Sequence, residues 1–390
     1  MLAHFGHHLL TALPVPLLPY IRDEFNLSYT RSALVNTAFS LSYGIGQLPA
    51  GWLADRIGAR ILITIGILGV AIAGVLVGLS QTFTMLLVFL VLMGLMGGGY
   101  HPASAPLISA SVEPKKRGRA LGIHLIGGSG SFFVAPIVAG AIAGVWGWRG
   151  PFIGLAIPSA ALGIIFFILL SRRRERMHAD RIAAQHPGEA KPAPGNVRRV
   201  VAFLVLSVIG GGMGFSITGF IPLYLVDHFG VSEQAAASLM AIIWSAGLWA
   251  GPVGGYISDR IGRVPVILAT GILGGIMIYL LRVFPYGWGI GDLFYMEGLG
   301  IGILLFLTGA ITFIRMPVSE AFIMGQVSAR RRSTIFGVYY FAMQQAGGIF
   351  APLVGVLVDH YGFHTTFTIA SAIGVGTTLL CAPFLWDSPD

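Results

Sequence analysis

The chain is organised as long runs of apolar residues separated by short polar stretches. The runs hold about 18 or more residues each, which is enough for a helix to cross about 30 Å of hydrocarbon. This pattern predicts an all-α membrane protein with twelve transmembrane helices. The predicted spans are 3–22, 31–54, 61–80, 83–111, 118–145, 149–171, 200–227, 232–258, 264–284, 292–318, 333–358 and 363–386.

A polar segment, Arg172–Arg199, divides the predicted spans into six and six. The segment is basic and contains three prolines, so it does not fit inside hydrocarbon. We therefore expect an N-terminal six-helix bundle over residues 1–171, a cytoplasmic basic linker over 172–199 and a C-terminal six-helix bundle over 200–390.

The two halves repeat one another in sequence. Phe25-Asn-Leu-Ser28 aligns with Phe229-Gly-Val-Ser232, and at the same spacing Gly51–Gly58 aligns with Gly255–Gly262. Six spans return each half to the side on which it began, so the halves are parallel repeats about an axis along the membrane normal. We expect two pseudo-symmetric bundles with a solute site near the midplane between them.

Composition and charge agree with a protein embedded in a lipid bilayer. Hydrophobic residues make up 55% of the chain and charged residues 10%, against about 25% charged in a typical soluble domain. The net charge of +8 does not indicate a nucleic-acid partner, because 19 of the 24 Lys and Arg residues fall in loops on one side. Basic loops stay in the cytoplasm, so we predict a multi-pass protein of the cytoplasmic membrane with both termini cytoplasmic.

A glycine-rich charged motif joins the second and third spans, and a second copy joins the eighth and ninth. Its residues are Gly51, Asp55, Arg56, Gly58 and Arg60, with Asp259, Arg260 and Gly262 in the second copy. The motif resembles the signature loop of the major facilitator superfamily. The resemblance implies secondary transport by rocking-switch alternating access, with Asp55 and Asp259 latching the halves on the cytoplasmic side. A tight solvated turn is the alternative reading.

The fifth span carries a second motif, built from Gly128, Gly130, Ala135, Pro136 and Gly140. It resembles the glycine–proline motif of the family's antiporters, although alanine stands at two positions where glycine is usual. The residues are equally consistent with a helix bent at proline and packed through small side chains.

Short motifs in the first half resemble the fosmidomycin-resistance branch of drug–proton antiporters. They are Ala3-His4-Phe5 in the first span and Gly99-Tyr100-His101-Pro102 in the fourth. The chain departs from that branch at His8, where the branch tends to carry Asp, and from drug antiporters at Met93, where they usually carry Arg.

Ionisable residues inside spans are costly to place in lipid and are therefore candidate functional residues. They are His4, His7, His8, His101, His124, Arg315 and Glu320. The first three lie on one helix face together with Thr11.

Three interpretations of these residues remain open. Imidazoles with Glu320 are suited to binding a coupling proton near neutral pH. They are also suited to ligating a transition-metal ion as transported cargo. In the third interpretation, each side chain is a structural residue satisfied by interhelical hydrogen bonds or by an Arg315–Glu320 ion pair. Arg315 is in addition suited to anchoring an anionic solute.

The sequence thus favours a monomeric secondary transporter, and specifically proton-coupled antiport that exports a small organic or anionic compound. Proton-coupled uptake of a metabolite and export of a transition-metal ion are the alternatives within this class. A membrane receptor or sensor that has lost transport is the alternative from another class. No enzyme, cofactor or resident metal ion is expected, since the chain has no HExxH or P-loop motif.

Overall fold

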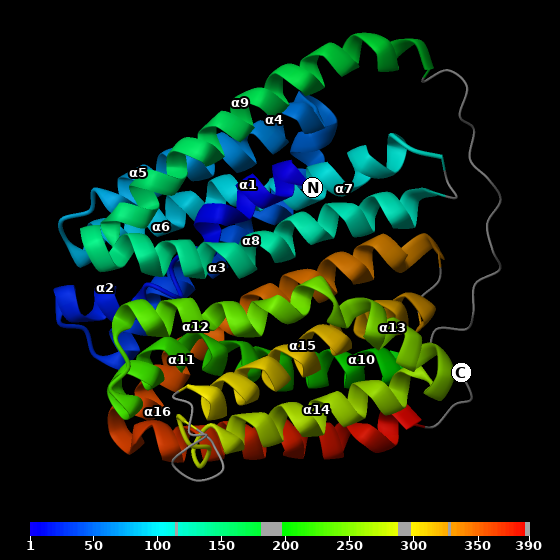
Figure 1. Cartoon of the computed structure of the whole chain (residues 1–390). Coiled ribbons are helices and arrows are strands. Elements are labelled where there is room, and N and C mark those ends of the chain that lie inside the picture. The colour runs from blue at the N-terminus through cyan, green and yellow to red at the C-terminus, as the bar shows by residue number, and fades with distance from the viewer. Residues whose placement is uncertain (114–115, 181–196, 288–297, 327–328, 387–390) are drawn as a thin grey trace. The chain divides into compact units, whose positions relative to one another are not determined.

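The protein is described from a computed structural model, which places residues 1–113, 116–180, 197–287, 298–326 and 329–386. Every regular element in these residues is helical (Figure 1). Helices satisfy all backbone hydrogen bonds within one segment, which a chain of this hydrophobicity requires in lipid. The predicted all-α fold class is therefore confirmed.

The chain separates into two compact units. The first contains Met1–Leu17 and Ala38–Ala190. Its helices are α1 (Leu2–Thr11), most of α3 (Tyr29–Ile57), α4 (Ala59–Thr64), the π-helix η1 (Ile65–Gly69), α5 (Val70–Gly78), α6 (Phe83–Gly98), α7 (Tyr100–Ala110), α8 (Arg117–Trp146) and α9 (Arg149–Asp180).

The second unit contains Leu18–Thr37 and Lys191–Asp390. Its helices are α2 (Leu18–Phe25), the start of α3, α10 (Val197–Val205), the π-helix η3 (Leu206–Gly211), α11 (Gly212–Phe229), α12 (Glu233–Ser245), the 3₁₀ turn η4 (Ala246–Leu248), α13 (Ala250–Ile261), α14 (Arg263–Leu280), α15 (Leu299–Gln326) and α16 (Ala329–Trp386). A short segment of the N-terminal repeat therefore packs with the C-terminal repeat.

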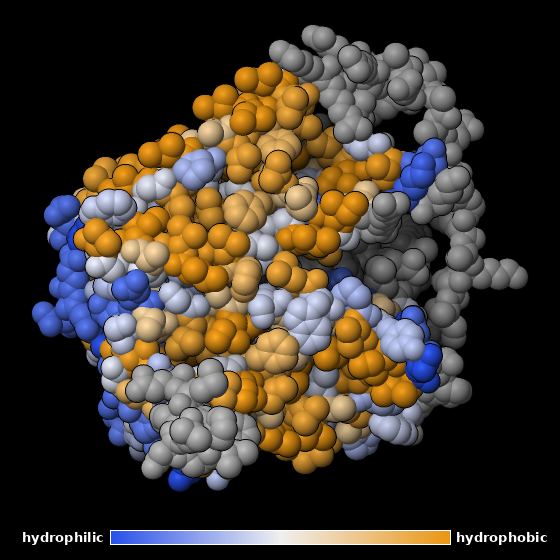
Figure 2. Space-filling model, in the orientation of Figure 1, coloured by the Kyte–Doolittle hydropathy of each residue, from blue (hydrophilic) through white to orange (hydrophobic). Residues whose placement is uncertain are grey.

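Apolar surface covers these helices. Figure 2 shows hydrophobic residues over most of the visible face, with hydrophilic residues toward the helix ends. Large apolar side chains such as Ile157 and Leu380 are more than 70% exposed, which suits contact with lipid rather than water. In the described part of the chain, eight helices are long and apolar enough to cross a membrane, or nine if the bent pair α12–α13 counts as one span. The total of twelve spans stays a prediction.

The first predicted span, 3–22, is not one continuous helix. Helix α1 ends at Thr11 and α2 begins at Leu18, with turns between them. Pro14 and Pro16 lie in this break, where each lacks a backbone N–H and obstructs the preceding helical turn. The break leaves α1 as a ten-residue helix that carries three histidines.

The sequence repeat is also visible in the backbone. Gly58 and Gly262, which are equivalent in the repeat, both end a helix with φ of +90°. Gly147 and Gly362 form a second such pair, with φ of +67° and +73°. Residues with a Cβ rarely adopt these angles, so glycine fixes the turns in each half. The turn at Gly362 divides α16 into two helices.

Candidate functional site

Five histidines gather in the first compact unit. Helix α1 presents His4, His7 and His8 on one face, as their spacing of three and four residues requires. His101 lies in the first turn of α7, and His124 lies on α8. Neighbouring ring centroids in this group lie 4.2–5.6 Å apart.

His8 and His101 face each other directly. Their Nε2 atoms lie 3.2 Å apart, and His8 Nδ1 lies 2.9 Å from Thr11 Oγ1. Two neutral imidazole nitrogens at this distance need one proton between them, which one ring donates and the other accepts. The two side chains are partly buried.

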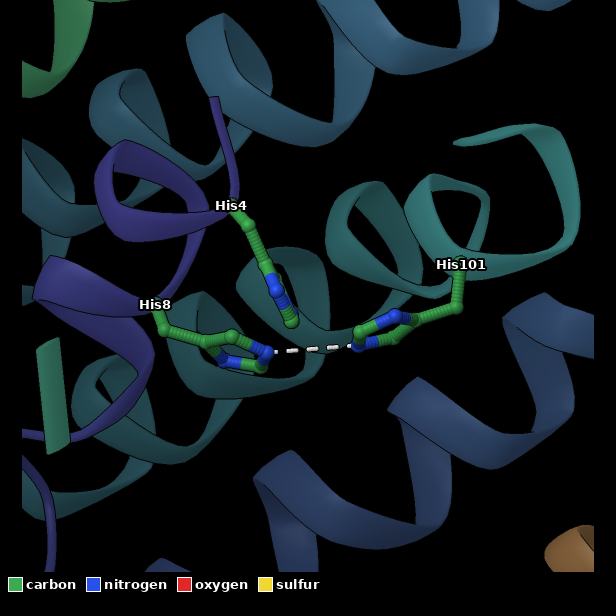
Figure 3. A group of neighbouring side chains, drawn as sticks. All are labelled: His4, His8 and His101. Atoms are coloured by element: carbon green, nitrogen blue, oxygen red, sulfur yellow. Dashed lines mark hydrogen bonds between the residues drawn. The ribbon is translucent and has the colours of Figure 1, made fainter. Parts of the chain in front are cut away.

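His4 completes a group of three, which we call the histidine triad (His4, His8 and His101; Figure 3). Its Nδ1–H donates to the backbone carbonyl of His124 at 2.8 Å, which leaves Nε2 with a free lone pair in the neutral ring. This Nε2 is buried and has no hydrogen-bond partner within the described residues. One ring nitrogen from each member of the triad lies within 4.8 Å of the others.

His7 is adjacent to the triad but chemically satisfied. Its Nδ1–H donates to the Gly66 carbonyl at 2.7 Å, and its Nε2 accepts from the Tyr43 hydroxyl at 3.0 Å. Gly66 belongs to the π-helix η1, a type of turn that often occurs at functional sites. The His7 ring also stacks on Tyr100, with centroids 4.2 Å apart. His7 therefore supports the site rather than offering a free ligand atom.

Glycine on α8 lets the triad approach that helix. A Cβ built at Gly128 would lie 2.5 Å from His4 Cε1, closer than real Cβ contacts allow. The His124 ring, one turn earlier, stacks on His4 with centroids 4.2 Å apart. At Gly130 the nearest heavy atom would be Phe5 Cδ2 at 3.9 Å, an ordinary contact. Gly128 thus has a local role next to His4, while Ala135 and Pro136 lie further along the same helix.

Arg315 and Glu320 lie on α15 in the second compact unit. Both are partly buried, and both lie close enough to Tyr339 to act on it electrostatically.

The two charged motifs at helix ends have parallel geometry. The Arg56 guanidinium lies 4.1 Å from the Trp52 ring centroid, and that of Arg260 lies 4.4 Å from the Tyr256 centroid. Arg60 donates to Ser171 Oγ at 2.7 Å. Asp259 is exposed, whereas the burial of Gly51 and of the Asp55 side chain lies outside what the structure describes.

A polar network in the second unit was not anticipated from the sequence. Asp227 accepts hydrogen bonds from Arg22 and from the Tyr29 hydroxyl, the latter at 2.6 Å. Asp359 accepts from the backbone N–H groups of Tyr29 and Thr30, each at 2.9 Å, and from the Thr30 hydroxyl. One signal was available, because Asp227 precedes Phe229 as Asp23 precedes Phe25 in the aligned repeat.

Comparison with known proteins decides the family. The profile described as Major Facilitator Superfamily matches residues 1–315. The chain belongs to the major facilitator superfamily. The resemblance seen in the motifs is therefore confirmed, and with it a multi-pass transporter that moves a small solute across a membrane.

Relatives and solved structures of this superfamily cover nearly the whole chain. Multidrug resistance protein MdtG of Proteus mirabilis (strain HI4320) is 28% identical over 375 residues, covering 93% of this chain and 89% of its own. MdtG of Escherichia coli O6:K15:H31 is 27% identical over 389 residues, which cover 97% of this chain and 90% of its own. A D-xylose–proton symporter crystal structure matches with a TM-score of 0.74 at 17% identity, covering 99% of this chain and 96% of its own. A crystal structure of a POT family transporter in complex with 5-aminolevulinic acid matches with a TM-score of 0.77 at 16% identity, covering 97% of this chain and 93% of its own.

At 17% and 16% identity, these two solved structures show that the fold is shared and nothing about the function of this chain. The roles of the histidines, of Arg315 and Glu320, and of the charged motifs remain predictions.

Proposed function

We propose that this transporter exports small organic compounds from the cytoplasm in exchange for protons. The observation that carries the proposal is the similarity to two multidrug resistance proteins along nearly the full length of both chains. The glycine–proline motif on α8 is in keeping with antiport. In this proposal the protein lies in the cytoplasmic membrane as a monomer, with both termini and the basic linker in the cytoplasm.

The contact between His8 and His101 supports the proton as the coupling ion. The two Nε2 atoms already share one proton, and a second proton would convert the pair to a charged, mutually repelling state. Imidazole is the side chain whose ordinary titration lies nearest to neutral pH, so a transmembrane pH difference is able to drive this change. Arg315 supports an anionic cargo, because a guanidinium binds carboxylates and phosphonates through two hydrogen bonds.

Fosmidomycin, an anionic phosphonate, is a suitable first probe. We expect expression in cells lacking their own exporters to raise the inhibitory concentration of fosmidomycin. In everted vesicles, where export carries cargo into the lumen, adding fosmidomycin to the medium should drive protons out of the lumen. If fosmidomycin and a panel of other antibacterial compounds all fail to move protons, the antiport proposal is wrong.

The His101→Gln variant tests the proposed proton carrier. Gln retains a hydrogen-bonding group but does not titrate near neutrality, so pH dependence should be lost while cargo binding is largely kept. His360→Gln is the matched control, because His360 is exposed and its Nδ1 bonds to the Val356 carbonyl of its own helix. A His101→Gln protein with wild-type pH dependence would exclude His101 as the proton carrier.

A further inference from the structure

We propose that the histidine triad is a binding site for a divalent transition-metal ion such as Zn²⁺ or Co²⁺. Three imidazole nitrogens from α1 and α7 converge, and Figure 3 shows the three rings pointing toward one another. Imidazole is a preferred ligand of Zn²⁺, Co²⁺, Ni²⁺ and Cu²⁺, whereas Mg²⁺ and Ca²⁺ prefer oxygen. The inference does not rest on the proposed export of organic compounds.

The distances suit such an ion. Ion–nitrogen bonds of about 2.0–2.1 Å at tetrahedral angles place two donor nitrogens about 3.3 Å apart. The Nε2 atoms of His8 and His101 lie 3.2 Å apart, close to this value. All three donor atoms lie within 4.8 Å of one another, so the His4 ring has to turn toward the other two rings to reach bonding distance of a shared ion.

The surrounding hydrogen bonds prepare the rings for metal. His4 donates Nδ1–H to the His124 carbonyl, and His8 Nδ1 lies within hydrogen-bond distance of Thr11 Oγ1. In metal sites, this kind of bond on the far ring nitrogen fixes the tautomer and points the other nitrogen at the ion. The buried His4 Nε2, which has no hydrogen-bond partner within the described residues, keeps its lone pair available for a bond to the ion. His7, with both nitrogens engaged, shows what a purely structural histidine looks like beside it.

The charge of the site indicates reversible binding. Neutral imidazoles do not cancel the double positive charge of the ion, so an ion in this partly buried place should hold a water or an anion at its fourth position. For both Nε2 atoms to bind an ion, the proton between them moves to Nδ1 of the ring that holds it, and an additional proton on either Nε2 would block the ion. Ion and proton therefore exclude each other at the triad.

The test uses the purified full-length protein in lipid nanodiscs, titrated with Co²⁺ and followed by its visible absorption. We expect one Co²⁺ per chain, displaced by Zn²⁺. X-ray absorption on the Zn²⁺-loaded wild type should show three imidazole nitrogens around the ion. Because this measurement needs no variant, it decides the proposal even if the variants fold poorly. An absence of Co²⁺ binding, or a shell made of oxygen alone, would overturn the proposal.

Variants then assign the ligands. His4→Gln, His8→Gln and His101→Gln should each weaken Co²⁺ binding at least about ten-fold. His124→Gln is the matched control, because it removes a neighbouring imidazole but keeps the backbone carbonyl that accepts from His4. We expect it to bind Co²⁺ as the wild type does, and an equal loss in all four variants would contradict the triad. Co²⁺ binding without export of fosmidomycin or of any compound in the panel would overturn only the export proposal, and export without Co²⁺ binding would overturn only the metal site.

Discussion

At the scale of single residues, Gly128 allows the triad to form beside α8. The His4 ring occupies the space where a Cβ at Gly128 would lie, and the two would be 2.5 Å apart. His4 has little freedom to move away without losing the bond from its Nδ1 to the His124 carbonyl. The position of the His4 imidazole therefore depends on glycine, which has no side chain, at residue 128 of α8.

We predict that Gly128→Ala destabilises the protein, whereas Gly130→Ala does not. Overpacking a tight contact costs about 1–3 kcal/mol, and the added methyl would also displace His4 from the triad. At Gly130 the nearest atom is 3.9 Å from the new Cβ, and Ala is the better helix former by up to about 1 kcal/mol. Thermal unfolding in detergent, compared between the two variants, measures this difference. Equal unfolding temperatures would show that His4 is not held against Gly128.

At the scale of elements, α3 begins in a set of hydrogen bonds that its own sequence does not supply alone. Ser28 Oγ accepts from the Arg31 N–H, as helix-capping serines do. The Tyr29 and Thr30 N–H groups donate instead to Asp359, which lies between the two predicted spans that make up α16. A carboxylate at a helix N-terminus is favoured both by these donors and by the helix dipole.

We predict that Asp359→Asn lowers stability at neutral pH by about 1 kcal/mol, the usual effect of losing such a cap. Burial alone would raise the pKa of the Asp359 carboxyl, but hydrogen bonds from Thr30 and Tyr29 outweigh burial and lower this pKa. Because the pKa of Asp359 is lower in the folded state, the stability that its carboxylate contributes is complete above the unfolded-state pKa of about 3.9. This stability is lost as the pH falls from that value through the folded-state pKa. The difference between wild type and variant should therefore shrink below about pH 4.

Unfolding curves recorded at several pH values check this prediction. A double-mutant cycle with Thr30→Val isolates the bond from the Thr30 hydroxyl, since valine keeps the backbone N–H and the side-chain shape. Additive effects of the two changes, or a difference from wild type that persists unchanged into acid, would argue against Asp359 as the cap of α3.

At the scale of the whole molecule, the charged motifs carry the prediction about alternating access. We expect Asp55→Asn to leave folding intact and to shift the transporter toward inward-open states, because the family resemblance assigns Asp55 to a cytoplasmic latch. The shift should correspond to a few kcal/mol at most, as is usual for a two-state bias. Electron-spin distances between one label on each bundle, in a Cys381→Ala background, measure it. Unchanged distances together with wild-type transport would refute the latch.

The orientation in the membrane is tested through the basic linker. Residue 185 lies outside the described residues, but the distribution of Lys and Arg predicts that it is cytoplasmic. We expect Gln185→Cys in a Cys381→Ala background to resist a membrane-impermeant maleimide applied to intact cells. Gln81→Cys, in an exposed turn predicted to lie outside, should be labelled under the same conditions. Labelling of position 185 but not 81 would reverse the orientation.

The sequence alone determined the fold class and the superfamily, because both depend on features local in the chain. Apolar runs predict helices in lipid, and the repeated motif ending in Gly58 and Gly262 marks equivalent turns whose backbone angles require glycine. The break at Pro14 and Pro16 was visible in the same way, although the prediction drew one helix through it.

Only the tertiary structure decided which histidines meet. The spacing of His4, His7 and His8 places them on one face, but it does not distinguish His7, held by a carbonyl and a tyrosine, from the two that face His101. That distinction depends on neighbouring helices, which supply a backbone carbonyl on α8 and a π-helical turn at η1. Hydrogen bonds from distant segments fix which ring nitrogen holds the proton, and no local pattern of residues contains that information.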